Sequence, residues 1–442
     1  MRPRPRPSGR RTDGSGTGTV QTIGLIRQRR WTTVIGTGLF VSMMAVGYYY
    51  NVTFVQLGLL DLGTTHLGLS SDTVVRLMAL FAVITCAVSL IVGFTMTRLG
   101  WSADMRTKLR VAAAVAAVQV GLTFASSWIG GEAGFTAWLV AAACTMGVGI
   151  PATFGLAVDL VPVRDRGAVA GLITGIAYFL APVASYPWTF EHLRAQVLPV
   201  LAAGAAGAVV LAVIPNRFVD GLAGQSADPG FGIGRYTAQR RHGGVLTLVA
   251  LAALMFGVFF IDSLGFLRLS EETAYMQGAW LSGDVSVRVF IGVVHVVGAW
   301  VAAVFYSVFD YRVLFAWAFG LFGLVHLLYT FPLRLGEPAP VLAEPMVYAL
   351  AVSVYTVLNF ALWADLSTPR TIARNSAIGV GLSGWTATFV STALALAWRQ
   401  AEMDLEAHLR IVDSIAVVLF LLVIAALYFK PALGGRAGRE AS

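Results

Sequence analysis

Apolar residues are gathered into long runs along almost the whole chain, and short polar segments separate these runs. A run of about 20 apolar residues is long enough to cross the hydrocarbon core of a bilayer as an α-helix. The sequence contains twelve such runs, and the polar stretch 215–243 divides them six and six. The pattern therefore predicts an all-α integral membrane protein with twelve transmembrane helices. The runs cover 33–60, 73–97, 109–130, 135–161, 168–188 and 196–214, then 244–267, 285–309, 313–331, 345–364, 375–398 and 411–429.

The polar segments divide the chain into five parts. The first 30 residues are rich in Arg, Pro and Gly, so we expect a disordered arm at 1–30. The apolar run that follows has no small-residue cleavage site, and we expect it to be kept as the first span. The other expected parts are a six-helix bundle at 31–214, a linker at 215–243, a second six-helix bundle at 244–430 and a tail at 431–442.

Composition excludes a water-soluble protein. Charged residues make up 12% of the chain and apolar residues 57%, whereas soluble domains usually carry about 25% charged residues. The mean hydropathy is +0.75. The two cysteines, Cys86 and Cys144, both lie inside apolar runs, so a disulfide framework and a thiolate metal site are excluded.

The distribution of positive charge predicts the orientation in the membrane. Lys and Arg residues stay preferentially on the cytoplasmic side of a membrane protein. If the segments alternate between two sides, 24 of these residues fall on the side of the termini and 5 on the other. We therefore expect both termini in the cytoplasm. We also expect a monomeric protein of the plasma membrane. The net charge of +8 is explained by this topology, so no nucleic-acid partner is expected.

Two stretches of the first half recur in the second half in the same order. SDTVVRLM at 71–78 is similar to GDVSVRVF at 283–290, and 156–172 is similar to 362–380. Six-helix units with the same orientation are parallel repeats, related by an axis along the membrane normal. The sequence therefore predicts two parallel six-helix halves. The matched charges are Asp72 with Asp284, Arg76 with Arg288, and Asp159 with Asp365.

The loop between the second and third runs, GFTMTRLGWSADMRTKLR, resembles the cytoplasmic signature of the major facilitator superfamily of transporters. Gly93, Arg98 and Gly100 match the signature, and Thr97 stands where the family has an Asp. The loop from 159 to 167 is also similar to a cytoplasmic loop of that family. In the second half, the place equivalent to the signature is occupied by Asp310 and Arg312.

The resemblance covers the whole span region and implies a fold and a mode of action. Transporters of this kind rock two halves about a cavity near the midplane of the membrane. The resemblance implies that the first, fourth, seventh and tenth helices line this cavity. We expect it to be faced by Tyr48, Tyr49, Asn51, Asp262, His295 and Asn359.

Asp262 and His295 are the strongest candidates for chemistry within the membrane. An ionisable side chain inside a span is expensive, so each is a functional hypothesis by default. Asp262 is either a proton-coupling carboxylate, a structural partner of Arg288 or Arg76, or a wall residue of the outer cavity. His295 either binds substrate or relays a proton with Asp262, or it is a packed core histidine.

The polar residues of the first and tenth runs have two interpretations each. Tyr48, Tyr49 and Asn51 offer aromatic faces and hydrogen-bonding groups to an organic solute, or they anchor the helix at the membrane interface. Asn359 either lines the site or forms a hydrogen bond between helices.

The repeated charges suggest gates at the two ends of the bundle. Asp72 with Arg76, and Asp284 with Arg288, are i, i+4 pairs that we expect to clamp the extracellular ends. At the cytoplasmic ends Asp159 and Asp365 are expected to pair with Arg166, Arg370 or Arg374. Arg98, Asp310 and Arg312 complete the predicted gating set.

These features favour a secondary active transporter of a small organic solute that works by alternating access, with proton coupling through Asp262 as one option. The rarity of buried cations argues against a dianionic substrate, and a neutral, amphipathic or weakly cationic solute fits better. The alternative is a non-transporting member of the same fold that acts as a sensor or assembly factor. The Gly-rich stretch 147–155 lacks the Lys-Ser/Thr of a phosphate-binding loop. We expect no enzyme activity and no cofactor or metal; the expected partners are the solute, the lipid bilayer and protons.

Overall fold

The computed structural model describes residues 31–213, 217–225, 228, 230–271, 279–309, 311–335 and 342–437. Within these residues the ordered elements are all helices, and twelve are long and apolar enough to cross a membrane. The all-α fold with twelve spans is therefore confirmed. The predicted arm at 1–30 lies outside the described residues, as does the end of the predicted tail, 438–442.

The first six spans follow the predicted apolar runs closely. The sixth begins earlier than predicted, at Phe190 instead of 196, because Asp61 accepts a hydrogen bond from the Phe190 N–H at 2.8 Å and so starts the helix ahead of the apolar run. The elements are α2 (Trp31–Tyr50), η1 (Asn51–Gly58), α3 (Leu59–Asp61), η2 (Leu62–His66), α4 (Ser71–Arg98), η3 (Trp101–Ala103), α5 (Met105–Ala125), η4 (Ser126–Trp128), α6 (Gly131–Gly155), α7 (Ala157–Leu160), η5 (Val163–Asp165), α8 (Arg166–Ala184) and α9 (Phe190–Val213).

A short helix, α10 (Arg217–Gln225), follows the sixth span and lies within the predicted linker. It packs against α2 and α7, beside the beginning of the first span. The six spans of the second half come after it. Their elements are α11 (Thr237–Glu271), α13 (Val285–Val308), α14 (Tyr311–Leu335), α15 (Ala343–Asp365), α16 (Ile372–Ser376), η6 (Ala377–Trp385), α17 (Thr386–Gln400) and α18 (Leu405–Ala437).

Polar residues between the apolar runs set where several helices begin. Ser70 accepts a hydrogen bond from the Thr73 N–H at the start of α4. Asp104 does the same for Arg106 at the start of α5. These side chains satisfy N–H groups that have no partner within the helix. A change from apolar to capping residues therefore marks the helix boundary in the sequence.

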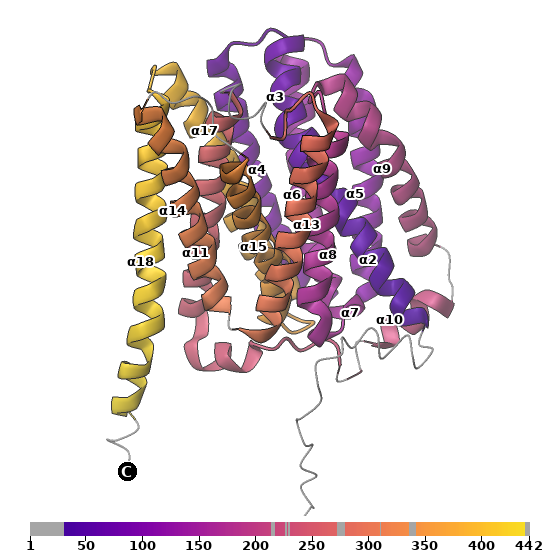
Figure 1. Ribbon diagram of the computed structural model, residues 1–442. Coiled ribbons are helices and arrows are strands. Elements are labelled where there is room, and N and C mark those ends of the chain that lie inside the picture. Colours follow the sequence, from indigo (N-terminus) through magenta and orange to yellow (C-terminus); the bar gives the residue numbers. More distant parts are fainter. Residues whose placement is uncertain are drawn as a thin grey trace, which may run out of the picture.

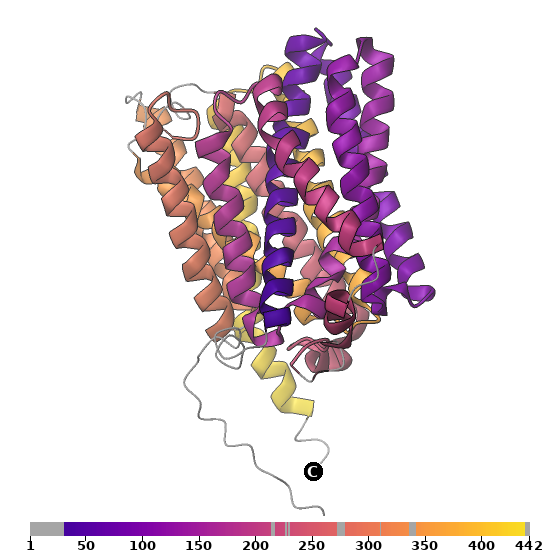
Figure 2. The same ribbon diagram turned by 90° about the vertical axis from the view of Figure 1, so that its right-hand side faces the viewer.

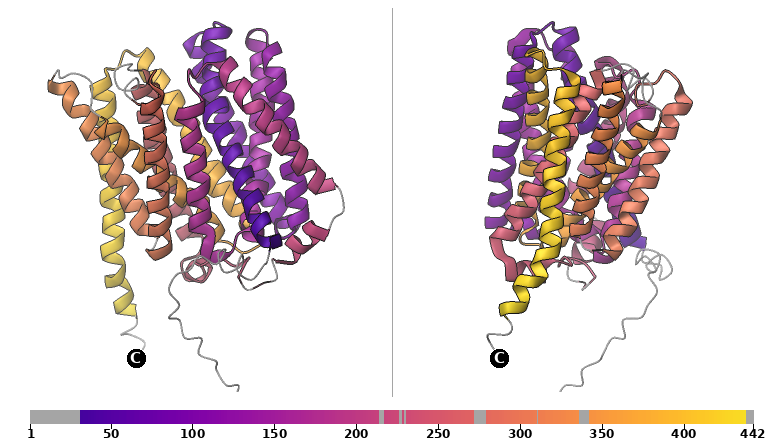
Figure 3. Two further views of the ribbon diagram at one scale, coloured as in Figure 1. Left: turned by 45° about the vertical axis from the view of Figure 1, so that its right-hand side comes forward. Right: turned by 60° about the vertical axis from the view of Figure 1, so that its left-hand side comes forward.

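The two halves stand side by side. The indigo-to-magenta helices lie mainly on the right and the orange-to-yellow helices mainly on the left in Figure 1 and in the left view of Figure 3. Between the halves α8 packs along α13, and α4 packs along α17. Small residues allow this closeness, since a Cβ at Gly171 would lie 2.9 Å from the Ala299 carbonyl oxygen.

The beginning of α2 and the end of α18 lie at the same end of the bundle, which we call the lower end (Figure 1). Figure 2 shows that α18 extends beyond the other helices at this end. An even number of spans brings both ends of the described chain to one side. The opposite end is called the upper end below.

Spans one and eleven contain wide π-helical turns, at η1 and η6. In η6 the Ser383 hydroxyl donates to the carbonyl of Ile378, five residues earlier, at 2.9 Å. The Thr386 hydroxyl donates to the Gly381 carbonyl in the same way. Such turns are frequent at functional sites because they displace side chains from the regular helical register. Both segments lie beside the space between the halves.

Candidate functional site

A cavity of about 70 Å³ lies between the two halves toward the upper end. Both halves contribute walls, and most of the large wall side chains are aromatic. The wall contains one carboxylate, Asp262, and neither Lys nor Arg. The aromatic wall residues are Tyr48, Tyr178 and Trp188 from the first half and Phe259, Phe266, Trp280, Tyr348, Tyr355 and Trp385 from the second.

Two tyrosine hydroxyls hold the Asp262 carboxylate. Tyr348 donates to Oδ1 and Tyr355 donates to Oδ2. These tyrosines are seven residues apart on α15, which is about two helical turns, so they share one face of that helix. A carboxylate accepts up to about four hydrogen bonds. Asp262, on α11, therefore keeps acceptor capacity for a group in the cavity.

His295 is 1% exposed and forms part of the cavity wall. Its Nε2 lies 3.2 Å from Nε1 of Trp280, which can only donate, and its Nδ1 lies 3.3 Å from the Ser353 hydroxyl. Accepting from an indole requires an unprotonated Nε2, so the imidazole is neutral with its proton on Nδ1. The ring also stacks on Tyr178 from the first half at 4.9 Å between centroids. Both ring nitrogens thus have partners within the protein.

The three predicted residues of the first span point to different places. The Tyr48 hydroxyl lies in the wall of the upper cavity, 3.1 Å from that of Tyr178. The Tyr49 hydroxyl instead bonds to Ser185 at 3.1 Å. Asn51 lines a second cavity of about 70 Å³ that shares Tyr48 and Trp385 with the first. The structure therefore brings Tyr48, and not Tyr49, together with Asp262 and His295.

Asn359 lies away from these cavities. Its side chain is 1% exposed, and Oδ1 accepts a hydrogen bond from Trp363 Nε1 at 3.0 Å on the same helix, α15. Asn359 matches neither interpretation, because it is not a wall residue of these cavities and its hydrogen bond lies within one helix instead of between helices. The lining of the tenth span is supplied instead by Tyr348, Val352 and Tyr355.

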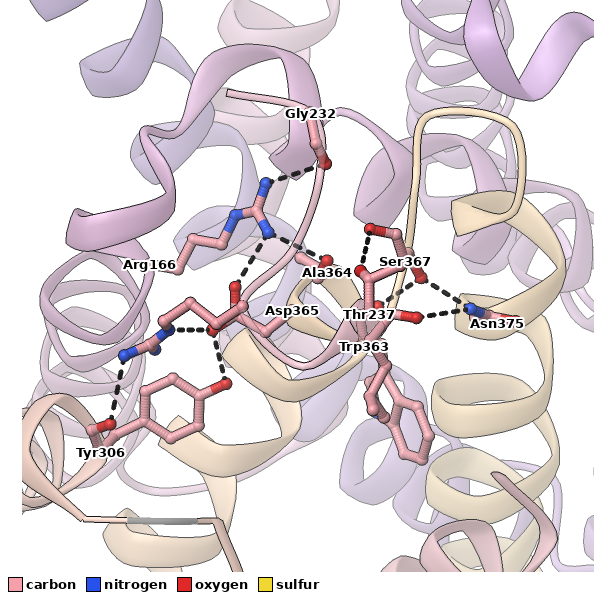
Figure 4. A network of polar contacts seen from close by, with 11 residues as sticks. Arg166, Gly232, Thr237, Tyr306, Trp363, Ala364, Asp365, Ser367 and Asn375 are labelled. Carbon is pink, nitrogen blue, oxygen red and sulfur yellow. Dashed lines mark hydrogen bonds and ion pairs between the residues drawn. The ribbon is translucent and has the colours of Figure 1, made fainter. Parts of the chain in front are cut away.

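At the lower end the Asp365 carboxylate of the second half is bonded by three donors, and one of them, Arg166, lies in the first half (Figure 4). Arg166, the first residue of α8, lies 2.9 Å from Oδ1. Arg235 lies 2.7 Å from Oδ2, and the Tyr306 hydroxyl donates to the same oxygen at 2.9 Å. Asp365 is fully buried and Arg166 is 2% exposed. The predicted pairing of Asp365 with Arg166 is therefore present, with two further donors that the sequence did not indicate.

Arg235 is held by more than its ion pair. Its guanidinium carbon lies 4.6 Å from the centroid of the Tyr306 ring. Burial lowers the pKa of the guanidinium, but the Asp365 carboxylate and the Tyr306 oxygen outweigh burial, and the net pKa lies above its ordinary value. The charged form of Arg235 is thus stabilised at this place.

Residues 230–237, which we call the strap, pass between the two halves at the lower end. The Gly232 N–H donates to the Val158 carbonyl of the first half at 3.0 Å, and Arg166 reaches the Gly232 carbonyl at 3.4 Å. On the other side the Gly234 N–H donates to the Ser367 carbonyl of the second half at 2.9 Å. Figure 4 shows Gly232 of the strap bonded to Arg166, and Ser367 bonded to Thr237 at the other end of the strap. The strap therefore bonds to both halves through its backbone.

Gly234→Ala is expected to loosen the strap, because an added Cβ would lie 2.3 Å from the Asp365 carbonyl oxygen. Overpacking of this kind typically costs about 1–3 kcal/mol, so the melting temperature of the purified protein in detergent should fall. Gly224→Ala in α10 is the matched control, since a Cβ there meets nothing within 4 Å. Equal melting temperatures for the two variants would contradict a tight strap.

Asp159 has a partner that differs from the predicted one. Its carboxylate lies 2.5 Å from Nζ of Lys108 on α5, and both side chains are fully buried. It forms no ion pair with Arg166, which is bound to Asp365 instead. Asp159 therefore joins α7 to α5 within the first half.

Among the described contacts, neither Arg98 nor Arg312 is bonded to Asp365. Arg98, the last residue of α4, is exposed. Arg312 lies over the ring of Tyr311 at 5.7 Å. Asp310 lies outside the described residues.

The predicted upper pairs are not ion pairs among the described contacts. Arg76 donates to the Thr73 hydroxyl at 3.3 Å instead of binding Asp72. Asp284 caps α13 by accepting from Ser286, and these hydrogen bonds lower the pKa of the carboxyl. The expectation of two i, i+4 clamps is therefore wrong in its geometry.

Arg288 nevertheless joins the halves at the upper end. Its guanidinium donates to the Ser282 carbonyl and lies 4.3 Å from the ring centroid of Tyr186 in the first half. A cation above an aromatic face is attracted by the ring quadrupole. The contact across the upper end is thus a cation–π pair.

Several site residues were missed by the sequence interpretation. Tyr348 and Tyr355 had a usable signal, since two tyrosines at i, i+7 on a cavity-lining helix must share a face. Arg235 and Lys108 had none, because both stand among loop charges that look alike in the sequence. The other missed residues are Tyr178, Trp280 and Tyr306.

The fold is similar to that of solved transporters. The proton:xylose symporter XylE, bound to 6-bromo-6-deoxy-D-glucose, gives a TM-score of 0.59 at 14% identity, with 88% of this chain and 94% of that chain covered. The human organic anion transporter MFSD10 gives 0.60 at 16% identity, with 89% and 99% covered. No protein-family model matches the sequence, and no curated protein sequence matches it. The chain therefore has the twelve-helix fold of the major facilitator superfamily of transporters.

Proposed function

We propose that this protein is a secondary transporter that moves a small organic solute across the plasma membrane by alternating access. The observation that carries the proposal is the upper cavity, whose walls come from both halves and contain the Asp262 carboxylate. A site shared between two halves is exposed to either side when the halves rock against each other. The distribution of positive charges supports a cytoplasmic location for the lower end and both termini.

The contacts at the lower end support a gate between the halves. Asp365 with Arg166 joins the second half to the first. Ser102, near the start of α5, donates to the Pro369 carbonyl at 2.8 Å and accepts from the Ala373 N–H. These bonds close the lower end, and they must break before the cavity opens there.

A proton can couple to the solute through Asp262. Two tyrosine hydroxyls donate to its carboxylate, which faces the cavity. Gaining or losing a proton at this position changes the charge of the wall by one unit, which alters the interaction with any polar solute. This arrangement supports proton-coupled transport.

The first test is a thermal-shift screen of the purified protein against chemically diverse metabolites and drugs. A ligand at 100 times its dissociation constant adds about 2.7 kcal/mol to the stability of the native state. A solute that stabilises the protein should then be accumulated by proteoliposomes. If no solute does either, and a crosslink across the lower gate leaves the protein's cellular phenotype unchanged, the non-transporting alternative is favoured.

Asp262→Asn is expected to abolish accumulation driven by a pH gradient while solute exchange at saturating concentration continues, because an amide cannot take up the coupling proton. The measurement is uptake into proteoliposomes with and without the gradient. Asp413→Asn is the control, since Asp413 also lies within a span, on α18, but outside the cavity wall. Accumulation by Asp262→Asn equal to that of the parent would refute coupling at this residue.

A further inference from the structure

We propose that the upper cavity binds a small organic ammonium ion, held by the Asp262 carboxylate and the surrounding aromatic rings. The inference rests on the proposed transport function and names its substrate class. It follows from the charge, the ring faces, the size and the polar groups of the cavity.

The cavity wall contains one negatively charged side chain and no Lys or Arg that would neutralise it. Asp262 is the one carboxylate of the wall, which contains neither Lys nor Arg. Among the described residues its carboxylate is bonded by Tyr348 and Tyr355 and forms no ion pair. A carboxylate in an apolar wall is costly unless it is paired. A cationic ligand supplies the missing partner, whereas an anionic ligand would be repelled.

Aromatic side chains line the cavity together with the carboxylate. Phe259 and Tyr355 meet edge to face at 4.8 Å between centroids, and Trp280 meets Tyr348 at 5.6 Å in the same manner. All four line the cavity with Asp262. Aromatic rings that line one cavity beside a carboxylate can form a cage, and aromatic cages recognise quaternary ammonium groups.

The size of the cavity restricts the ligand. Its volume is about 70 Å³. One water molecule needs about 10–15 Å³ on this scale, so the space corresponds to about five to seven waters. This fits a small ammonium ion.

Several polar groups of the wall are already bonded within the protein. His295 is bonded through Nε2 to Trp280 and through Nδ1 to Ser353. The Tyr348 and Tyr355 hydroxyls are committed to Asp262. The wall also contains Gln56, Trp188, Ser263 and Thr388, so discrimination against an uncharged solute depends on the Asp262 carboxylate.

The test compares two probes of nearly the same shape, choline and its uncharged analogue 3,3-dimethyl-1-butanol, by isothermal titration calorimetry of the full chain in detergent. Choline should bind at least about tenfold more tightly, because only choline gains the ionic and cation–π interactions. Asp262→Asn should weaken choline binding about 10- to 100-fold and leave the analogue unchanged. Asp413→Asn serves as the control that retains parental binding of choline.

A second variant tests the same site independently, in case Asp262→Asn fails to fold. Phe259→Leu keeps an apolar side chain in the wall but removes a ring face. Choline affinity should fall about 3- to 30-fold, with no change for the analogue. Equal affinity of the parent for the two probes, or equal losses for both probes in these variants, overturns the ammonium site.

Counterflow of radiolabelled choline in proteoliposomes separates this inference from the proposed function. Choline that binds in an Asp262-dependent way but does not cross the membrane supports the ammonium site and contradicts transport. Failure of choline to bind, with transport of a sugar or an organic anion, overturns the ammonium site and leaves the transporter in place.

Discussion

Replacing Lys108 with methionine is expected to lower the free energy of unfolding by about 3–5 kcal/mol, since it leaves a buried carboxylate without its partner. Nζ of Lys108 lies 2.5 Å from Asp159 and 3.1 Å from the Gly155 carbonyl oxygen. Both charged side chains are fully buried, so water cannot replace the lost ammonium group. Thermal and denaturant unfolding of the purified protein in detergent measures the effect.

Two controls assign the loss to the unpaired charge. The double variant Lys108→Met with Asp159→Leu should regain most of the lost stability, because removing both charges removes the desolvation penalty. Arg106→Met disrupts a pair of the same length, 2.5 Å to Asp220, whose side chains are 51% and 59% exposed. An exposed pair contributes about 0–1 kcal/mol, so this variant should be nearly neutral. A double variant no more stable than Lys108→Met alone would contradict the explanation.

Asp365→Asn is expected to shift the protein toward a form with an open lower end. The substitution removes the charge that binds Arg166 and Arg235. Of these two cations Arg166 belongs to the first half, and a hydrogen bond to a charged group contributes about 1.5–3 kcal/mol, so its loss changes the equilibrium by about 10- to 100-fold. A change of about 100-fold raises an open form populated at about 1% to about 50%.

Distances between spin labels at the lower end measure that shift. Leu99 in the first half and Arg370 in the second are both exposed and can carry labels after Cys86 and Cys144 are replaced. The longer-distance population should grow in Asp365→Asn. Asp104→Asn is the control, because Asp104 is exposed, caps α5 within the first half, and asparagine caps equally well. An unchanged distance distribution in Asp365→Asn would argue against the gate.

The sequence predicted the fold well, because each span is a local property of the chain. A hydrophobic run predicts the helix that it forms. A capping residue such as Ser70 predicts where the following helix begins. The parallel arrangement of the two halves likewise followed from stretches of sequence that recur in the same order in each half. The start of α9 was missed because it depends on Asp61, a residue more than a hundred positions earlier.

The site was predicted only in part, because it is assembled from distant segments. Asp262 and His295 could be recognised because they are ionisable residues within apolar runs. The structure places both in the wall of one cavity. Their partners are aromatic residues, which resemble ordinary span residues until the helices are packed. The i, i+4 spacing of Asp72 and Arg76 favoured a pair, yet Thr73 offers Arg76 a nearer acceptor.

The strap makes the two ends of a repeated molecule unequal. A parallel repeat supplies similar helices to both ends, but a single covalent connection joins the halves, and its strap bonds at the lower end. Closing the lower end therefore gains backbone hydrogen bonds that closing the upper end does not. In the proposed transporter without bound solute, this difference would bias the resting population toward the form with a closed lower end. It would not set the direction of net flux, which the gradients determine, but it would make the apparent affinity for solute different on the two sides of the membrane.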